Sequence, residues 1–77
     1  MKMIKYFIVS PSGIKAQGEC RSFIFPGCDG MLGIMPGRAP LVSPCLSGYV
    51  SIDGKKTAVN SAILTFKDNI LTLCQAE

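Results

Sequence analysis

The hydrophobic and polar positions of this chain follow the two-residue period of β-strands, and no segment keeps the period of an amphipathic helix. In segment 2–10, Ile4, Tyr6 and Ile8 share one face, and the opposite face is also largely apolar. A strand that is apolar on both faces is typically covered on both sides. Residues 2–10 are therefore predicted to form a strand with the core on one side and a further contact on the other.

Clusters of turn-forming residues separate several more short segments of this kind. Phe23 and Phe25 alternate in one of them and are expected in the core. Asp53-Gly54 is a strong signal for a β-hairpin, and Pro44 makes its strand an edge strand or an irregular one. Short strands at this spacing predict an all-β sandwich or barrel. The expected strands cover residues 2–10, 14–19, 21–25, 31–35, 41–46, 49–52, 56–59, 62–66 and 70–74.

Segment 30–41 combines turn-forming residues with large apolar side chains. Gly33, Pro36 and Gly37 lie too close together for a helix, so a short strand over 31–35 is expected to run into a sharp turn. Pro36 and Gly37 suit the two central positions of a type II turn. The residue before Pro40 stays extended, so Arg38 is predicted at the tip of a rigid loop.

The run Leu32-Gly33-Ile34-Met35-Pro36-Gly37-Arg38-Ala39-Pro40-Leu41 resembles the most recognisable motif of the epsilon subunit of bacterial F-type ATP synthase. That family usually has histidine at the position of Arg38, and two glycines at the positions of Ser61-Ala62. Segments 25–30, 47–52, 63–66 and 69–73 also resemble its N-terminal β-sandwich domain. The resemblance implies one domain over residues 1–77, a small antiparallel β-sandwich of about ten short strands in two sheets.

In that family the sandwich is a non-catalytic part of the central stalk. It packs against the gamma subunit and touches the polar loops of the c ring. The resemblance therefore implies a subunit that couples gamma to the c ring during proton-driven ATP synthesis, at the cytoplasmic face of the bacterial cell membrane and without a cofactor. The positions that match the c-ring contact are Asp29, Gly30 and Met31. The positions that match the gamma interface are Ser10, Arg38, Ala39, Pro40 and Ser43.

The family usually continues into a two-helix C-terminal hairpin, which inhibits ATP hydrolysis and in some members binds ATP. The sequence stops at Gln75-Ala76-Glu77, directly after the last expected strand. We therefore expect a coupling subunit without this hairpin, its inhibition or its ATP site.

The composition is more apolar than a small free domain requires. Charged residues make up 17% of the chain, and the mean hydropathy is +0.36. A domain of this size has a small core, so part of the apolar surface is expected to face a partner. The net charge of +3 is spread along the chain and does not favour a nucleic-acid partner. No apolar run is long enough for a membrane span or a signal peptide, so the chain is expected to stay in the cytosol.

The residues that usually carry metal binding or catalysis are few. The chain has no histidine, and its carboxylates lie in turns or at segment ends, so an enzyme is the least favoured class. Four cysteines without a C-x-x-C pair are expected to be buried or half-buried thiols in a reducing cytosol; disulfides or a metal site are the alternative. The glycines of segment 27–37 lack the Lys-Ser/Thr pair of a phosphate loop.

Two interpretations stay open for the residues that the motif brings forward. Met31 and Met35 suit an adaptable contact surface but equally a core position. Arg38 either makes bidentate contacts to a partner or is simply solvated. The competing function is a small β-barrel that binds single-stranded nucleic acid, for which only Tyr6 and Tyr49 are plausible stacking platforms.

Overall fold

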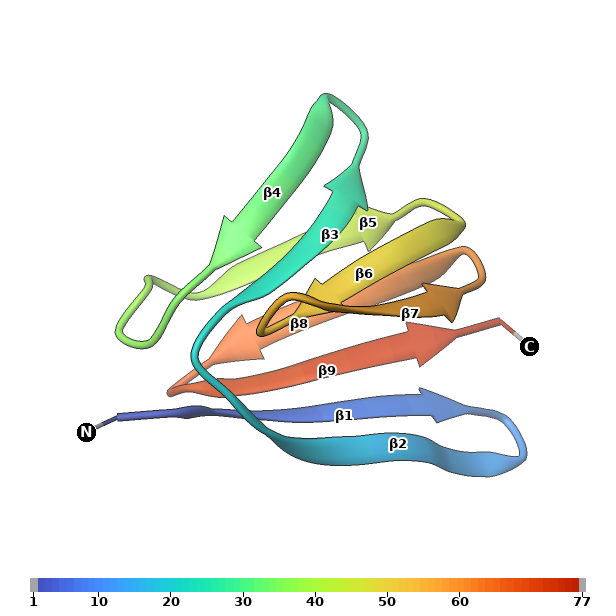
Figure 1. Cartoon of the computed structure of the whole chain (residues 1–77). Helices are drawn as coiled ribbons and strands as arrows, with labels where there is room; N and C mark the ends of the chain where they lie inside the picture. The colour runs from blue at the N-terminus through green and yellow to red at the C-terminus, as the bar shows by residue number, and fades with distance from the viewer. Residues whose placement is uncertain (1, 77) are drawn as a thin grey trace.

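Two β-sheets stacked face to face form the computed structural model, which describes residues 2–76 (Figure 1). This is the predicted all-β sandwich, with nine strands in the described residues where about ten were expected. The strands are β1 (Ile4–Ser10), β2 (Gly13–Cys20), β3 (Phe23–Gly27), β4 (Gly30–Ile34), β5 (Leu41–Cys45), β6 (Gly48–Ile52), β7 (Lys55–Val59), β8 (Ala62–Lys67) and β9 (Ile70–Gln75).

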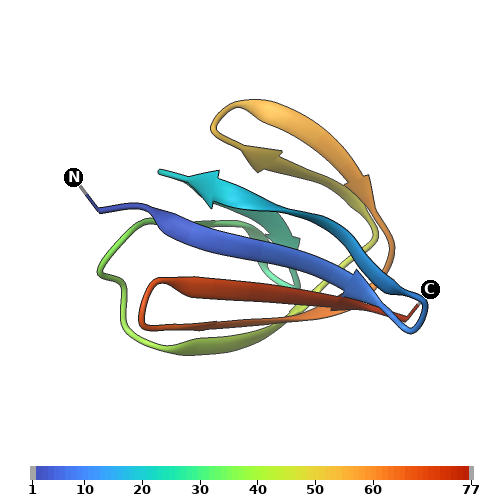
Figure 2. The ribbon, with the colours of Figure 1, turned by 90° about the horizontal axis from the view of Figure 1, so that it is seen from below.

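The five-stranded sheet has the order β2-β1-β9-β8-β5, and the four-stranded sheet has the order β4-β3-β6-β7. Every pair is antiparallel except β1 with β9, which run parallel from Lys5 opposite Ile70 to Val9 opposite Cys74. The sequence predicted only antiparallel pairing, because hairpin turns signal local pairs and nothing local signals the pairing of the first and last strands. As a result, the start of β1 and the end of β9 lie at opposite ends of the molecule (Figure 2).

One hydrophobic core lies between the sheets, and strand alternation supplies it. In β8 the buried residues are Ala62, Leu64 and Phe66, while the residues between them are exposed. The four-stranded sheet contributes Phe23 and Phe25 of β3 to this core, and both are fully buried, as predicted. The remaining buried apolar residues are Ile4, Ile8, Cys20, Ile34, Cys45, Val50, Val59, Leu71 and Leu73.

The turns follow the predicted chemistry with one change of length. Asp53 and Gly54 connect β6 to β7 at φ values of +52° and +86°. The turn between β8 and β9 has two residues, Asp68 and Asn69, and not three, because Lys67 still pairs with Ile70. Both turns have the positive φ values of the tight turns that match strand twist. Pro44 lies in β5 at the edge of its sheet, as predicted.

Candidate functional site

The loop between β4 and β5 presents Arg38 to solvent and has the predicted turn geometry. The Arg38 backbone N–H donates to the Met35 carbonyl at 3.3 Å, and Gly37 between them has φ +86°. This left-handed value at the third turn position is where glycine is favoured. The Arg38 side chain stays near its own backbone, since Nη1 donates to the Ala39 carbonyl oxygen at 3.2 Å. The guanidinium is thus held at the loop surface.

Asn69 anchors this loop, although its sequence context indicates only a turn residue. Its Oδ1 accepts the Gly37 backbone N–H at 2.7 Å, and its carbonyl oxygen accepts the Lys5 N–H at 2.9 Å. The φ of Asn69 is +62°, which asparagine tolerates better than most residues. One residue therefore connects the Arg38 loop, through its side chain, and β1, through its backbone carbonyl, to the β8–β9 turn. An asparagine in a hairpin turn was the available signal, but its distant partner could not be inferred from spacing.

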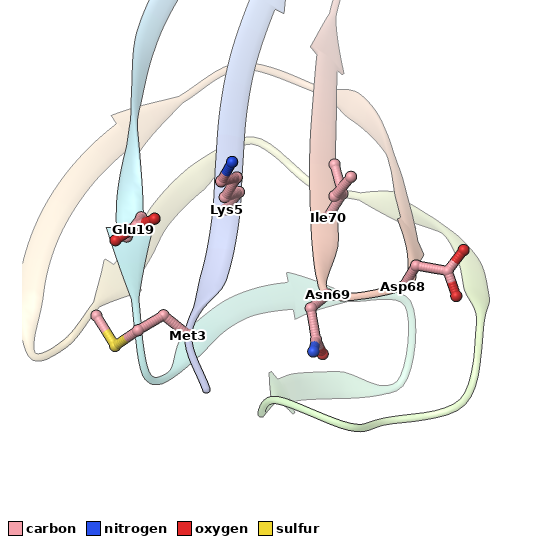
Figure 3. A pocket seen from close by; sticks show the side chains of 6 residues that line it. All are labelled: Met3, Lys5, Glu19, Asp68, Asn69 and Ile70. Carbon is pink, nitrogen blue, oxygen red and sulfur yellow. The ribbon is translucent and has the colours of Figure 1, made fainter. Parts of the chain in front are cut away.

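An open hollow lies beside this anchor, at the start of β1 (Figure 3). It is lined by Met3, Lys5, Glu19, Asp68, Asn69 and Ile70. Figure 3 shows the carboxylates of Glu19 and Asp68 well separated, on opposite sides of Lys5 and Ile70. General acid–base chemistry needs groups that converge on one reacting atom. The hollow is therefore interpreted as a structural feature and not as a catalytic site. Within it, Asn69 holds the backbone of the β4–β5 loop through Gly37.

The residues matched to the c-ring contact lie together, in the turn of the β3–β4 hairpin and at the start of β4. Asp29 is exposed in the turn, Gly30 has φ +120°, and Met31 is 60% exposed. Gly30 has the left-handed value because it leaves the turn directly opposite Gly27. Met31 is therefore a surface residue, and the interpretation of it as a core residue is wrong. Met35 is likewise exposed, at 63%.

The residues matched to the gamma interface are not gathered in one place. Arg38, Ala39 and Pro40 lie in the exposed β4–β5 loop, while Ser10 lies at the far end of β1 (Figure 1). The Ser10 hydroxyl is occupied in its own turn, 3.0 Å from the Ser12 hydroxyl. Ser43 is only 9% exposed, and its hydroxyl donates to the Pro44 carbonyl at 2.9 Å. Its side chain shares the inner face with Leu64, so little of it reaches the surface.

The outer face of the five-stranded sheet lies between the Ser10 end and the Pro40 end. Registered partners lie side by side on it across all five strands, apolar toward the Ser10 end and charged, with Glu19, Lys5 and Lys67, toward the Pro40 end. Val42, Ile63 and Ile14 are 74%, 50% and 60% exposed on it. One row of this face consists of Ile14, Val9, Cys74, Ile63 and Pro44. These exposed apolar side chains make this face a candidate contact surface.

Comparison with known proteins places this geometry in a family. Residues 3–76 match the family model described as the ATP synthase, Delta/Epsilon chain, beta-sandwich domain. The chain belongs to this family. The match covers nearly every described residue, so both sheets and the Arg38 loop are parts of the family domain.

Curated relatives agree with this assignment. The ATP synthase epsilon chain of a Nitratiruptor species is 39% identical over 62 residues, which are 77% of this chain and 48% of the relative. The epsilon chain of Leptospira interrogans serovar Lai is 35% identical over 74 residues, which are 91% of this chain and 58% of the relative. The chain thus spans about half the length of the relatives that it matches.

A solved structure shares the fold. It is the central stalk and c ring of the Tetrahymena thermophila mitochondrial ATP synthase, with a TM-score of 0.78 and 8% sequence identity. The alignment covers 99% of this chain and 65% of that chain. At this identity the likeness supports the sandwich fold of the family.

The four cysteines of this family member are all free, and they divide into two pairs of opposite character. Cys20 and Cys45 are buried as expected, but the prediction is wrong for Cys28 and Cys74, which are exposed. Cys28 lies in the β3–β4 turn, and Cys74 points outward from β9 because its neighbour Leu73 points inward. Within residues 2–76 no group of cysteines and carboxylates is close enough to hold a metal ion.

Thiol reactivity is expected to follow this division. Burial, and secondarily the negative charge of Asp53, raises the pKa of Cys20 to about 11, and burial also raises the pKa of Cys45. Since the thiolate is the nucleophile, iodoacetamide at pH 8 should label Cys28 and Cys74 quickly. Cys20 and Cys45 should react at least ~100-fold more slowly. Mass spectrometry of the labelled peptides measures this.

The control for this labelling is the double variant Cys28→Ser/Cys74→Ser, which should show no fast labelling. Unfolding in urea should then make Cys20 and Cys45 reactive. Fast labelling of Cys20 in the folded wild-type chain would contradict its burial.

The nucleic-acid alternative loses one of its two stacking platforms. Tyr6 faces the core, where its ring centroid lies 6.1 Å from that of Phe23. Its hydroxyl end also lies over Gly18, so the ring is not free to stack on a base. Tyr49 is 63% exposed and stays available on the four-stranded sheet.

Residues 2–76 contain no helix with the length and apolar character that crossing a membrane requires.

Proposed function

We propose that this chain is a non-catalytic central-stalk subunit of an F-type ATP synthase, coupling the gamma subunit to the c ring during proton-driven ATP synthesis. The observation that carries the proposal is the match of residues 3–76 to the delta/epsilon β-sandwich domain. The names of the relatives, ATP synthase epsilon chains, support the same complex. The chain would then be peripheral, on the cytoplasmic face of the bacterial cell membrane, and attached through the complex.

The gamma subunit is proposed to bind along the outer face of the five-stranded sheet. That face runs between the two separate positions matched to gamma, Ser10 at one end and the Arg38–Pro40 loop at the other. One extended partner surface lying on it would contact both ends and cover exposed apolar side chains such as Val42 and Ile63. Ser43 would then contribute mainly through its backbone, since its side chain is nearly buried.

The c ring is proposed to meet the β3–β4 hairpin, where Asp29, Gly30 and Met31 lie. This hairpin is at the far side of the molecule from the β1–β2 turn (Figure 1). A rigid sandwich with contacts at separate places is suited to transmitting torque, because a packed core deforms little under load.

Calorimetry with the matching gamma subunit tests the gamma contact. We expect one-to-one binding, weakened about tenfold in Arg38→Ala, because an arginine on a fixed loop makes geometrically specific contacts. Asn69→Gly keeps the positive φ but removes the Gly37 anchor, so it should weaken binding by a smaller factor. Lys56→Ala, on the outer face of the four-stranded sheet, is the matched control and should bind as the wild type does.

The docking face is tested separately by Ile63→Asp, with Tyr49→Asp on the opposite sheet as its control. Ile63→Asp should weaken gamma binding, because it places a charge among the exposed apolar side chains of this face. A folded chain that binds no gamma subunit would overturn the proposed function. Loss of binding in Tyr49→Asp instead would place gamma on the other sheet.

A further inference from the structure

Four strands lie at sheet edges, and β4 is the edge strand that lacks the residues that usually prevent pairing with another chain. The sheet orders leave β2 and β5 at the edges of one sheet, and β4 and β7 at the edges of the other. Natural edge strands are usually shielded by charges or proline, which prevent pairing with another chain. β2 has Lys15 and Glu19, β5 has Pro44, and β7 begins with two lysines. The sequence of β4, Gly-Met-Leu-Gly-Ile, contains none of these residues.

The free backbone groups of β4 can be assigned from its pairing with β3. Met31 lies opposite Pro26, which has no N–H to donate, so this is a non-hydrogen-bonded pair. Gly33, two residues further along β4, forms the same kind of pair with Ile24. Met31 and Gly33 therefore direct their backbone N–H and C=O groups away from β3. Among residues 2–76, none of the backbone bonds made by turns and loops reaches Met31 or Gly33. In Figure 1 no other strand lies along this side of β4.

We propose that β4 pairs with the β4 strand of a second copy of this chain, antiparallel and centred on Leu32. In this register Met31 of each copy lies opposite Gly33 of the other, and both are residues with outward backbone groups. The two pairs would form on the order of four backbone hydrogen bonds. The two four-stranded sheets would then join into one continuous sheet with two-fold symmetry.

The side chains of β4 are complementary to a second copy in this register. On the outer face, the 60%-exposed Met31 would lie across Gly33, which has no side chain to obstruct it. On the inner face, Leu32 would lie beside its own copy and cover the 41% of its surface that is now exposed. The large Met31 thus lies across the small Gly33 of the other copy, and the two Leu32 side chains pack against each other at the symmetry axis.

Charge at the ends of β4 favours the same partner. Asp29 precedes the strand, and Arg38 follows it after the Met35–Arg38 turn, so the two ends of β4 have opposite charge. Antiparallel pairing places Asp29 opposite Met35 of the other copy, next to the turn that ends at its Arg38. Each end of the paired strands then combines a carboxylate with a guanidinium. Parallel pairing would place like charges together.

A strand-to-strand contact of this size belongs to the weak class of interfaces. We expect a Kd of roughly 10–500 μM, so dimers form only in concentrated solutions of the free chain. Because Met31 is also proposed at the c ring, dimerisation and ring docking would compete for the same strand.

The test replaces Leu32 by lysine in one variant and by glutamate in another. Sedimentation equilibrium up to about 1 mM should show a monomer–dimer equilibrium for the wild type. Leu32→Lys and Leu32→Glu alone should each weaken it about tenfold or more, because like charges meet at the symmetry axis. An equimolar mixture of the two variants should dimerise again, since lysine then faces glutamate.

The control is Val42→Lys on β5, whose side chain is 74% exposed at an edge that Pro44 protects. It should dimerise as the wild type does, and circular dichroism should show all variants folded. Full dimerisation of either single variant, or a mixture of folded variants that stays monomeric, would overturn the proposal. A monomeric wild type would also overturn it and leave the edge for a strand of a different protein.

Discussion

Replacing Phe25 by alanine is expected to lower the free energy of unfolding by about 3–5 kcal/mol. The ring is fully buried on β3 and fills the space between the two sheets. Alanine would remove the transfer free energy of the ring and leave a cavity that two hydrogen-bonded sheets cannot close. A chain of 77 residues has a total stability of about 4–12 kcal/mol, so this loss is a large part of it. Equilibrium denaturation in urea measures the difference.

The matched control is the neighbouring residue Ile24, which points to the opposite face of the same strand. Its side chain is 37% exposed, and its cross-strand partners are the small residues Gly33 and Ser51. Ile24→Ala should cost less than about 1.5 kcal/mol, because solvent fills the space that the side chain leaves. Equal losses in the two variants would contradict the assignment of β3's inner face to the core.

Much of this architecture is predictable because it is local. The alternation of Phe23 with Phe25, the Asp53-Gly54 turn and the edge position of the strand with Pro44 each follow from two or three adjacent residues. Strand period and turn chemistry act over such short distances, so the sequence contains them directly. The resemblance of segment 32–41 then provided the family, which the match over residues 3–76 supports.

The features that could not be predicted depend on residues far apart in sequence. The parallel pairing of β1 with β9 brings the first and last strands together without any turn between them. The exposure of Cys74 depends on which face of β9 the core occupies, which the strand's mixed pattern left open. The bond from Gly37 to Asn69 joins residues 32 positions apart. Long-range pairing of this kind is decided by the whole core and not by one segment.

The candidate site shows the same division between local and long-range information. The type II turn that presents Arg38 was predictable from Pro36-Gly37. The near-burial of Ser43 was not, since an alternating strand has two possible faces and serine suits either one. Whether a position that matches a family motif lies at the surface therefore depends on the fold and not on the motif alone.

Asp53 clamps the point where the chain crosses from one sheet to the other. Its Oδ1 accepts the backbone N–H groups of Arg21 and Ser22 at 2.8 and 3.0 Å, and its own N–H donates to the Ser22 carbonyl at 3.1 Å. Arg21 and Ser22 connect β2 of the five-stranded sheet to β3 of the four-stranded sheet. The same residue has φ +52° in the β6–β7 turn, so its backbone serves the turn while its side chain holds the crossing.

Asp53→Ala is therefore expected to lower the free energy of unfolding by about 2–3 kcal/mol, combining lost charge-assisted hydrogen bonds with a strained left-handed alanine. Two companion variants separate these causes. Asp53→Gly relieves the backbone strain but loses the acceptor, so it should cost less than alanine. Asp53→Asn keeps a carbonyl oxygen and tolerates the positive φ, and should be the mildest of the three. Urea denaturation of all three gives the order; a glycine variant as stable as the wild type would show that the two hydrogen bonds contribute nothing to stability.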